Sequence, residues 1–282
     1  MRLLLPVCLA LFAATAATRV PVGALTADQI ARQIQDRDTG RDSRAEFRMK
    51  LFDRRGRVRE RALTLLTLRG REAPGAPKTA PDGDRLLIRF TYPNDIRGTA
   101  FLVWKHPKGE DERFLFLPSL GRVRRIAGSE AQESFVGSDF SYEDIGGRDF
   151  EDYSYALLDE NATWAGPDRS PRPAYRLESR RKDRSVEFPR VVSLVLKDTF
   201  VVVQADIYNR RDEKQKVYTV KRLEQLQGIW TVMDSSMSNG LEQTRTELAV
   251  EKIEYNTGVK EDAFSRRALE AASPPRGGAT SR

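Results

Sequence analysis

The chain has 282 residues, of which 32% are charged and 39% hydrophobic, and its formal net charge is +7. Basic and acidic residues are interspersed rather than grouped in blocks, which is typical of a solvated exterior. No basic motif interleaved with aromatic residues is present, which argues against a nucleic-acid-binding protein. The length suits one large β domain or two ordinary ones. Contact with anionic membrane headgroups or with an acidic partner stays open.

The first 24 residues have the pattern of a secretory signal peptide. A basic second residue precedes an apolar run from Leu3 to Ala14, and Val22-Gly23-Ala24 offers a cleavage site of small residues. The run is too short to span a bilayer. We therefore expect cleavage near Ala24 and a periplasmic mature chain beginning at or near Leu25. Cys8, the only cysteine, lies inside this leader, so we expect neither lipidation nor a disulfide.

The mature chain opens with one helix and then changes to a strand pattern. Thr26-Ala27-Asp28-Gln29 is a capping box, which predicts a helix of about ten residues that ends near Gly40. From Ala45 apolar residues alternate with polar ones, which predicts a half-buried strand. A turn at Arg54-Arg55-Gly56-Arg57 then predicts a hairpin whose second strand covers residues 58–69.

The next strands carry more apolar surface than a simple meander needs. After a loop at residues 70–83, strands are expected at residues 85–92, 99–105, 112–117 and 122–126. Two of them, which contain Phe101-Leu102-Val103-Trp104 and Phe114-Leu115-Phe116-Leu117, are apolar on both faces. Continuous apolarity predicts burial of both faces, so one face packs on structure and the other is covered by helices or by a ligand.

The second half repeats the strand pattern. A strand at residues 153–158 and a loop at 161–173 are followed by strands at 175–180, 191–196, 200–209, 216–226, 229–233 and 244–255. A short helix is expected at residues 264–269. This number and spacing of strands predict one antiparallel meander curled into an open or closed barrel. The domain should cover residues 25–270, and the tail at residues 271–282, rich in proline and glycine, should be disordered.

Between the two halves lies the stretch from Phe135 to Asp144, which differs from its flanks. Ser138 or Asp139 is expected to cap a short helix start. The stretch combines a hinge residue with large apolar side chains, as a lid over an apolar cavity requires; the residues are Phe135, Gly137, Phe140 and Tyr142. The alternative is a buried connecting loop whose aromatic rings complete the core.

The residues that carry catalysis or bind metals are mostly absent. His106 is the only histidine, and beside Pro107 it is typical of the surface end of a strand. Zinc would need histidine and cysteine ligands that the sequence lacks, so we expect no metal site and no cofactor. An acidic set lacks EF-hand spacing and is interpreted as solvated loop charge; it comprises Asp139, Glu143, Asp144, Asp149, Glu151 and Asp152. Accordingly, we expect no enzymatic activity.

Several blocks of sequence carry a family resemblance. They are Tyr92-Pro93 with Gly98-Thr99-Ala100-Phe101-Leu102, Phe114-Leu115-Phe116-Leu117-Pro118, the run from Arg122 to Ile126, the run from Ser134 to Asp144 with its Gly-Ser-Asp-Phe-Ser-Tyr-Glu-Asp block, and Gln227-Gly228-Ile229-Trp230 followed by Asn239 and Thr244. The chain resembles the outer-membrane lipoprotein-sorting protein family, within the superfamily of LolA and LolB. The resemblance implies an incomplete β-barrel whose apolar concave face is closed by helices and holds acyl chains. It also suggests an inner-membrane exporter as a partner.

We interpret the sequence as a mainly β periplasmic carrier that passes acyl chains of lipoproteins or other lipids between envelope components in outer-membrane biogenesis. The candidate lining of its cavity is Leu66, Leu68, Ile88, Phe90, Phe101, Val103, Phe114 and Phe116. Which face of each two-sided strand lines the cavity stays open, as do the cargo and the direction of transfer. The alternatives are a non-catalytic scaffold or adaptor of an envelope export complex and, third, an exported hydrolase that depends on His106.

Overall fold

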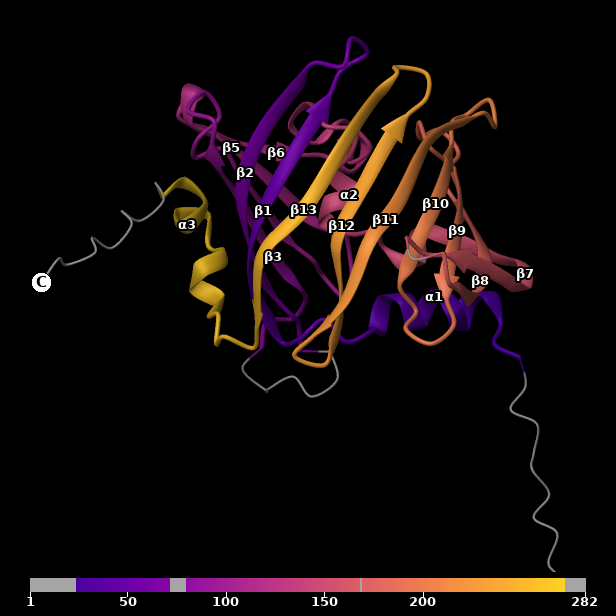
Figure 1. Cartoon of the computed structure of the whole chain (residues 1–282). Helices are drawn as coiled ribbons and strands as arrows, with labels where there is room; N and C mark the ends of the chain where they lie inside the picture. The colour runs from indigo at the N-terminus through magenta and orange to yellow at the C-terminus, as the bar shows by residue number, and fades with distance from the viewer. Residues whose placement is uncertain (1–23, 72–79, 168, 272–282) are drawn as a thin grey trace, which may run out of the picture.

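The structure is a computed structural model, and it describes residues 24–71, 80–167 and 169–271 (Figure 1). In this part of the chain thirteen strands form one antiparallel sheet in the order β6-β5-β4-β3-β2-β1-β13-β12-β11-β10-β9-β8-β7. The two edge strands, β6 and β7, are joined by no ladder within the described residues. The sheet is therefore an incomplete barrel, and the mainly β fold class predicted from the sequence is confirmed.

The strands are long and the helices short. The strands are β1 (Asp42–Phe52), β2 (Val58–Leu68), β3 (Arg85–Tyr92), β4 (Ala100–Trp104), β5 (Glu112–Leu117), β6 (Arg122–Ile126), β7 (Tyr153–Ala165), β8 (Pro171–Arg181), β9 (Arg190–Leu196), β10 (Val202–Tyr208), β11 (Lys214–Leu226), β12 (Ile229–Asn239) and β13 (Thr244–Tyr255). The α-helices are α1 (Ala27–Asp36), α2 (Tyr142–Gly146) and α3 (Arg266–Glu270).

The order of the strands requires a long connection between the two edges of the sheet. From the centre, β1 to β6 run outward in sequence to one edge, and β7 to β13 return from the opposite edge to the centre. Residues 127–152, here called the crossing segment, connect the two edges. They contain three short 3-10 turns and α2. In Figure 1 α2 lies within the curve of the sheet.

Most elements begin and end where the residue pattern predicts. The bounds of β3, β5, β6 and β13 agree with the prediction, and α1 has the expected capping box at Thr26, although it ends at Asp36 rather than near Gly40. The predicted loop at residues 161–173 is wrong because β7 continues to Ala165 and β8 begins at Pro171. Shifts in the β7–β8 register beside Asp159 accommodate the turn-like residues without ending the strand.

Strands β3 to β5 are covered on both faces, as the two-sided apolar pattern predicts. On the inner face the crossing segment packs against β1 to β5 through Phe135 and Tyr142, and α1 packs against β8 and β9. On the outer face of β3 to β5 lies the C-terminal segment, residues 259–270, whose Phe264 and Leu269 are buried. The indole Nε1 of Trp104 donates a hydrogen bond to the carbonyl oxygen of Phe264 at 2.7 Å.

Two predictions about the termini lie outside the described residues. These are the leader at residues 1–23 and the tail at 272–282; part of the predicted loop at residues 70–83 is also outside. Within the described part of the chain, no helix combines the length and the apolar character that a membrane span requires.

Candidate functional site: an apolar cavity on the inner face

A cavity of about 770 Å³ lies on the inner face of the sheet. Its wall combines side chains from both halves of the sheet with residues of α1 and of the crossing segment. The apolar lining includes Phe47, Met49, Leu63, Leu65, Leu86, Ile88, Val103, Val202, Ala205, Ile207, Met237, Leu248 and Val250. A volume of this size falls within the range of roughly 300–1,000 Å³ that is typical of sites for a single small molecule.

The predicted lining residues divide into three groups. Three of the eight line the cavity: Leu68, Ile88 and Val103. Two more, Phe90 and Phe101, belong to the same inner cluster but lie beneath the crossing segment. The remaining three pack in the outer cluster against the C-terminal segment: Leu66, Phe114 and Phe116. As a lipid-binding set, all eight stay a prediction.

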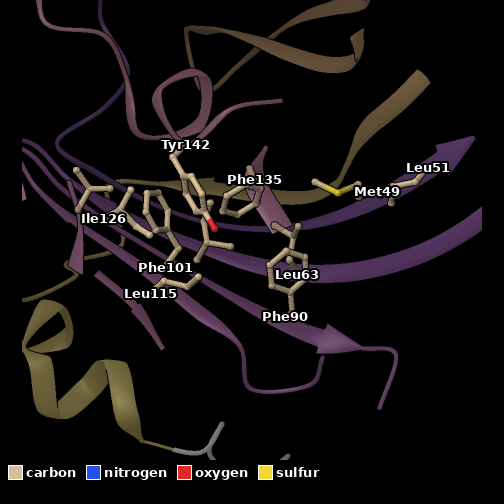
Figure 2. Close-up of a cluster of buried hydrophobic side chains, with 11 residues drawn as sticks. Met49, Leu51, Leu63, Phe90, Phe101, Leu115, Ile126, Phe135 and Tyr142 are labelled. Carbon is tan, nitrogen blue, oxygen red and sulfur yellow. The ribbon is translucent and has the colours of Figure 1, made fainter. Parts of the chain in front are cut away.

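Of the four predicted lid residues, Phe135 and Phe140 line the cavity. Phe135 is fully buried, and its ring centroid lies 5.8 Å from that of Phe90, 5.5 Å from that of Phe101 and 5.6 Å from that of Tyr142. Figure 2 shows these rings grouped together, with Phe135 beside Tyr142 and next to Phe101 and Phe90. Offset and edge-on aromatic pairs of this kind stabilise a packed core beyond the area that they bury.

Phe140 and its neighbour Asp139 attach the crossing segment to the other half of the sheet. Phe140 is buried beside Ile207 and Met237, which lie on β10 and β12. The Asp139 carboxylate accepts hydrogen bonds from the hydroxyls of Thr244 and Thr246 on β13. These contacts are buried polar bonds to a charged acceptor, which are among the stronger hydrogen bonds in proteins.

The turn before α2 has a defined backbone conformation. Val136 adopts φ +49° and Gly137 φ +73°, and the carbonyl oxygen of Val136 accepts a 2.6 Å hydrogen bond from Arg61. A β-branched residue at positive φ is rare, so tertiary contacts hold it there. An added Cβ at Gly137 would meet nothing within 4 Å. Glycine is therefore favoured at 137 by its backbone conformation and not by crowding.

The cap of α2 is Ser141, which corrects the expectation that Ser138 or Asp139 caps a helix. The Ser141 hydroxyl accepts a hydrogen bond from the backbone N–H of Asp144, and the Asp144 carboxylate accepts one from that of Ser141. This reciprocal pair is a capping box. Ser138 instead donates its hydroxyl to the carbonyl oxygen of Phe140.

The interpretation of the acidic set as solvated loop charge is wrong for three of its members. Asp139, Glu143 and Asp144 lie largely out of solvent, because each provides hydrogen-bond acceptors that fold the crossing segment. Glu143 forms an ion pair with Arg181 and accepts a 3.1 Å hydrogen bond from the hydroxyl of Tyr153. These acidic residues therefore act as anchors of the crossing segment.

Asp144 shows how this charge is balanced. Burial alone would raise the pKa of Asp144, but the Arg148 guanidinium at 3.0 Å and the Ser141 cap hold that pKa below its usual range. Asp144 is therefore ionised at neutral pH, and the pair stabilises the turn that ends α2.

Solved structures of two other proteins resemble this chain closely in fold and length. A DUF1329 family protein from Desulfovibrio piger is 30% identical, with a TM-score of 0.74 over 86% of this chain and 97% of that chain. A family model described as an uncharacterized protein matches residues 82–271. The chain belongs to the DUF1329 family. A domain from Vibrio parahaemolyticus, described as an outer membrane lipoprotein-sorting protein domain, is 27% identical, with a TM-score of 0.75 over 87% of this chain and 98% of that chain.

A more distant solved structure has the same fold. A LolA superfamily protein from Nitrosomonas europaea has a TM-score of 0.65 at 18% identity, over 87% of this chain and all of that chain. At that identity the likeness shows the shared fold alone. The fold and family resemblance predicted from the sequence are thus confirmed. Among curated proteins, no sequence matches this one.

The sequence did not predict the part of the cavity wall that β9 to β13 provide. Tyr218, Val232 and Leu248 line it together with the predicted strands. Their alternating pattern marks each as facing a core, but it does not say that β13 returns to pair with β1.

No group of three potential metal ligands occurs in the described ranges. His106 lies at the surface 3.2 Å from Glu112, and the absence of catalysis stays a prediction.

Proposed function

We propose that this DUF1329 protein is a periplasmic carrier that holds acyl chains of lipoproteins or other lipids in the inner cavity. It would pass them between envelope components without a catalytic step. The observation that carries the proposal is the cavity itself, which is walled by apolar side chains from both halves of the sheet. Each methylene group that leaves water for such a wall contributes about 0.8 kcal/mol.

The relatives support the class of function. The fold is that of a LolA superfamily protein, and the Vibrio parahaemolyticus domain with a similar fold is described by its role in lipoprotein sorting. Function transferred through a fold is an analogy, so it sets the class and leaves the cargo to experiment. The proposal also includes export with cleavage near Ala24, transient membrane contact and an inner-membrane exporter as partner.

The direct test is mass spectrometry of an organic extract of protein purified from the envelope fraction. We expect lipid in about equimolar amount or less, because the cavity volume suits a single ligand. Protein that carries no extractable lipid and takes up none when incubated with vesicles would instead support the scaffold alternative.

A matched pair of variants links bound lipid to this cavity. Leu86 is half-buried on the cavity wall, whereas Leu158 on β7 is 50% exposed. Leu86→Asp places a carboxylate on the apolar wall and should abolish lipid binding. Leu158→Asp adds the same charge outside the cavity and should retain it. Equal lipid content in both variants, with both folded, would contradict binding at this site.

A further inference from the structure

The cavity has a polar end and an apolar end. Pairing of Ser43 with both Thr67 and Tyr255, and of Leu68 with Arg85, brings the starts of β1 and β3 beside the ends of β2 and β13. The lining at this end is polar and comprises Arg37, Thr39, Ser43, Thr67, Arg69, Asp84, Arg85, Thr231 and Tyr255. The crossing segment contributes Phe135 and Phe140 to the lining, and the charged residues that it adds, Glu143, Asp144 and Arg148, are held in ion pairs. Asp139, next to Phe140, bonds to the start of β13 at the other end. The cavity is therefore amphipathic along its length.

Among the lining residues of this end cations outnumber anions, and the carboxylate of Asp84 is largely engaged. Asp84 accepts a 2.7 Å hydrogen bond from the backbone N–H of Gly70 and lies 3.5 Å from the Nε of Arg69. Arg85 is satisfied differently, because its Nη1 donates to several backbone carbonyl oxygens, including that of Lys105 at 3.0 Å. Arg85 also lies 3.8 Å from Glu261, so Arg69 shares the Asp84 carboxylate and Arg37 is the guanidinium that forms no ion pair among the described residues.

Among the described residues, Arg69 has a buried donor without a hydrogen-bond partner and Arg37 forms no ion pair. Arg37 donates to the carbonyl oxygen of Trp230 at 3.1 Å and forms no ion pair with any described residue. Burial lowers the pKa of Arg37, and the nearby positive charge of Arg69 adds to that effect. Arg69 donates from Nη1 to the hydroxyl of Thr39 at 2.9 Å, while its Nε is buried without a hydrogen bond. Placing two cations together in a partly desolvated wall is costly unless an anion joins them.

We propose that Arg37 and Arg69 bind the anionic head group, a carboxylate or a phosphate, of an amphiphile whose chain occupies the apolar end. This rests on the proposed carrier function and names the class of its ligand. A guanidinium presents a planar set of donors that matches both anions, and desolvation strengthens the pairing. The cavity volume of about 770 Å³ is consistent with one lipid-sized ligand.

The test compares ligands that share a chain and differ in head-group charge. The fluorescent fatty acid cis-parinaric acid is titrated into the full mature chain in parallel with its uncharged methyl ester. Lysophosphatidic acid and zwitterionic lysophosphatidylcholine then compete with the bound probe, and inorganic phosphate is a further competitor. We expect the acid to bind at least about tenfold more tightly than the ester, a ratio that corresponds to about 1.4 kcal/mol. Rising salt should weaken acid binding only.

Three variants assign the preference to these residues. Arg37→Gln and Arg69→Gln should each weaken binding of the acid about tenfold and leave ester binding unchanged. Arg37→Lys keeps the charge and should retain most of the affinity. The control Arg44→Gln removes the same charge from an exposed position on β1 and should change neither ligand. Unchanged melting temperatures would show that the loss is not one of folding.

The outcomes separate this proposal from the carrier function on which it rests. Equal binding of acid and ester, or an acid affinity unaffected in both glutamine variants, would overturn the head-group site while leaving a lipid carrier. Failure of every amphiphile to bind would overturn the carrier function as well. Displacement of the probe by inorganic phosphate alone would show a free-anion site and contradict the requirement for an attached chain.

Discussion

Phe135→Ala tests whether the crossing segment is a fixed part of the core or a movable lid. Phe135 is fully buried, and its ring contacts those of Phe90, Phe101 and Tyr142 at centroid distances between 5.5 and 5.8 Å. Its backbone N–H also donates a 2.7 Å hydrogen bond to the carbonyl oxygen of Phe140. These contacts predict that the side chain stabilises the native sheet and does not merely cover it.

The magnitude follows from the burial. Replacing a fully buried phenylalanine by alanine typically lowers the free energy of unfolding by about 3–5 kcal/mol. Because each kcal/mol shifts the melting temperature of a domain of this size by about 2–4 °C, we expect a decrease of about 6–20 °C. A residue on a lid that opens freely would change stability by less than about 1 kcal/mol, since it adds little to the sheet.

The assay is urea unfolding followed by tryptophan fluorescence, combined with hydrogen exchange of the amides in residues 135–146. Leu158→Ala is the matched control, because it removes an apolar side chain that is 50% exposed and should change stability by at most about 0.5 kcal/mol. The reasoning is refuted if Phe135→Ala unfolds like the wild type while lipid exchange becomes faster. That result would establish a lid.

Four further predictions concern single side chains, the leader and the two inner helices. Trp104→Phe removes the indole donor to Phe264 and should lower the unfolding free energy by about 1 kcal/mol; equal urea midpoints would contradict it. Asp144 has a lowered pKa, so its stabilising charge is present above the unfolded pKa of about 3.9 and is lost as the pH falls through the folded value. Asp144→Asn should therefore be less stable than the wild type at neutral pH, with the difference vanishing in acid; a pH-independent difference would argue against this assignment. Intact-mass measurement of protein from the envelope fraction should give an amino terminus at or near Leu25, and a retained leader would overturn export with cleavage. Hydrogen exchange should be faster in α1 than in α2; equal protection would show that both are fixed.

Much of the fold could be predicted because alternation of apolar residues is a local signal. The strand at residues 85–92 was placed correctly, since Leu86, Ile88 and Phe90 share one face. The prediction failed at β12, which was expected to end at Met233 and continues to Asn239. Ser235 and Ser236 resemble a turn in the sequence, yet both are buried in the sheet. Small polar residues mark a turn only when they are exposed, and exposure depends on the tertiary fold.

The cavity was less predictable than the strands. The two-sided pattern at residues 101–104 predicts two covered faces but does not say what covers each of them. The structure places the crossing segment over Phe101 and Val103 and the C-terminal segment over Leu102. The helix predicted at residues 264–269 is a 3-10 turn at Glu261–Phe264 followed by α3 at Arg266–Glu270. Its apolar residues need a sheet face to pack on, and this was the signal that could have assigned the outer face.

The same reasoning explains why the two arginines of the polar end were missed. Arg37 and Arg69 are far apart in the sequence and look like ordinary surface charges beside a helix end and a strand end. The pairing of Ser43 with Thr67 in the β1–β2 hairpin brings these ends together, and the pairing of β1 with β13 completes the wall around them. The position of a charged residue in the cavity wall can be predicted only after the strand order is known, because the strand order determines which strand ends lie side by side.

The distribution of contacts determines which end of the cavity is able to open. The crossing segment is held by buried aromatic rings and by the Glu143–Arg181 ion pair, and breaking such a buried pair costs about 3–5 kcal/mol. In α1 only Ile30 and Ala31 are buried, and the salt bridge of Arg32 to Glu151 is exposed, where such pairs contribute about 0–1 kcal/mol. Local opening takes the path that breaks the fewest buried contacts. We therefore expect a ligand to enter beside α1, at the end of the cavity that carries Arg37 and Arg69, and we expect the residues predicted as a lid to stay in place as its floor.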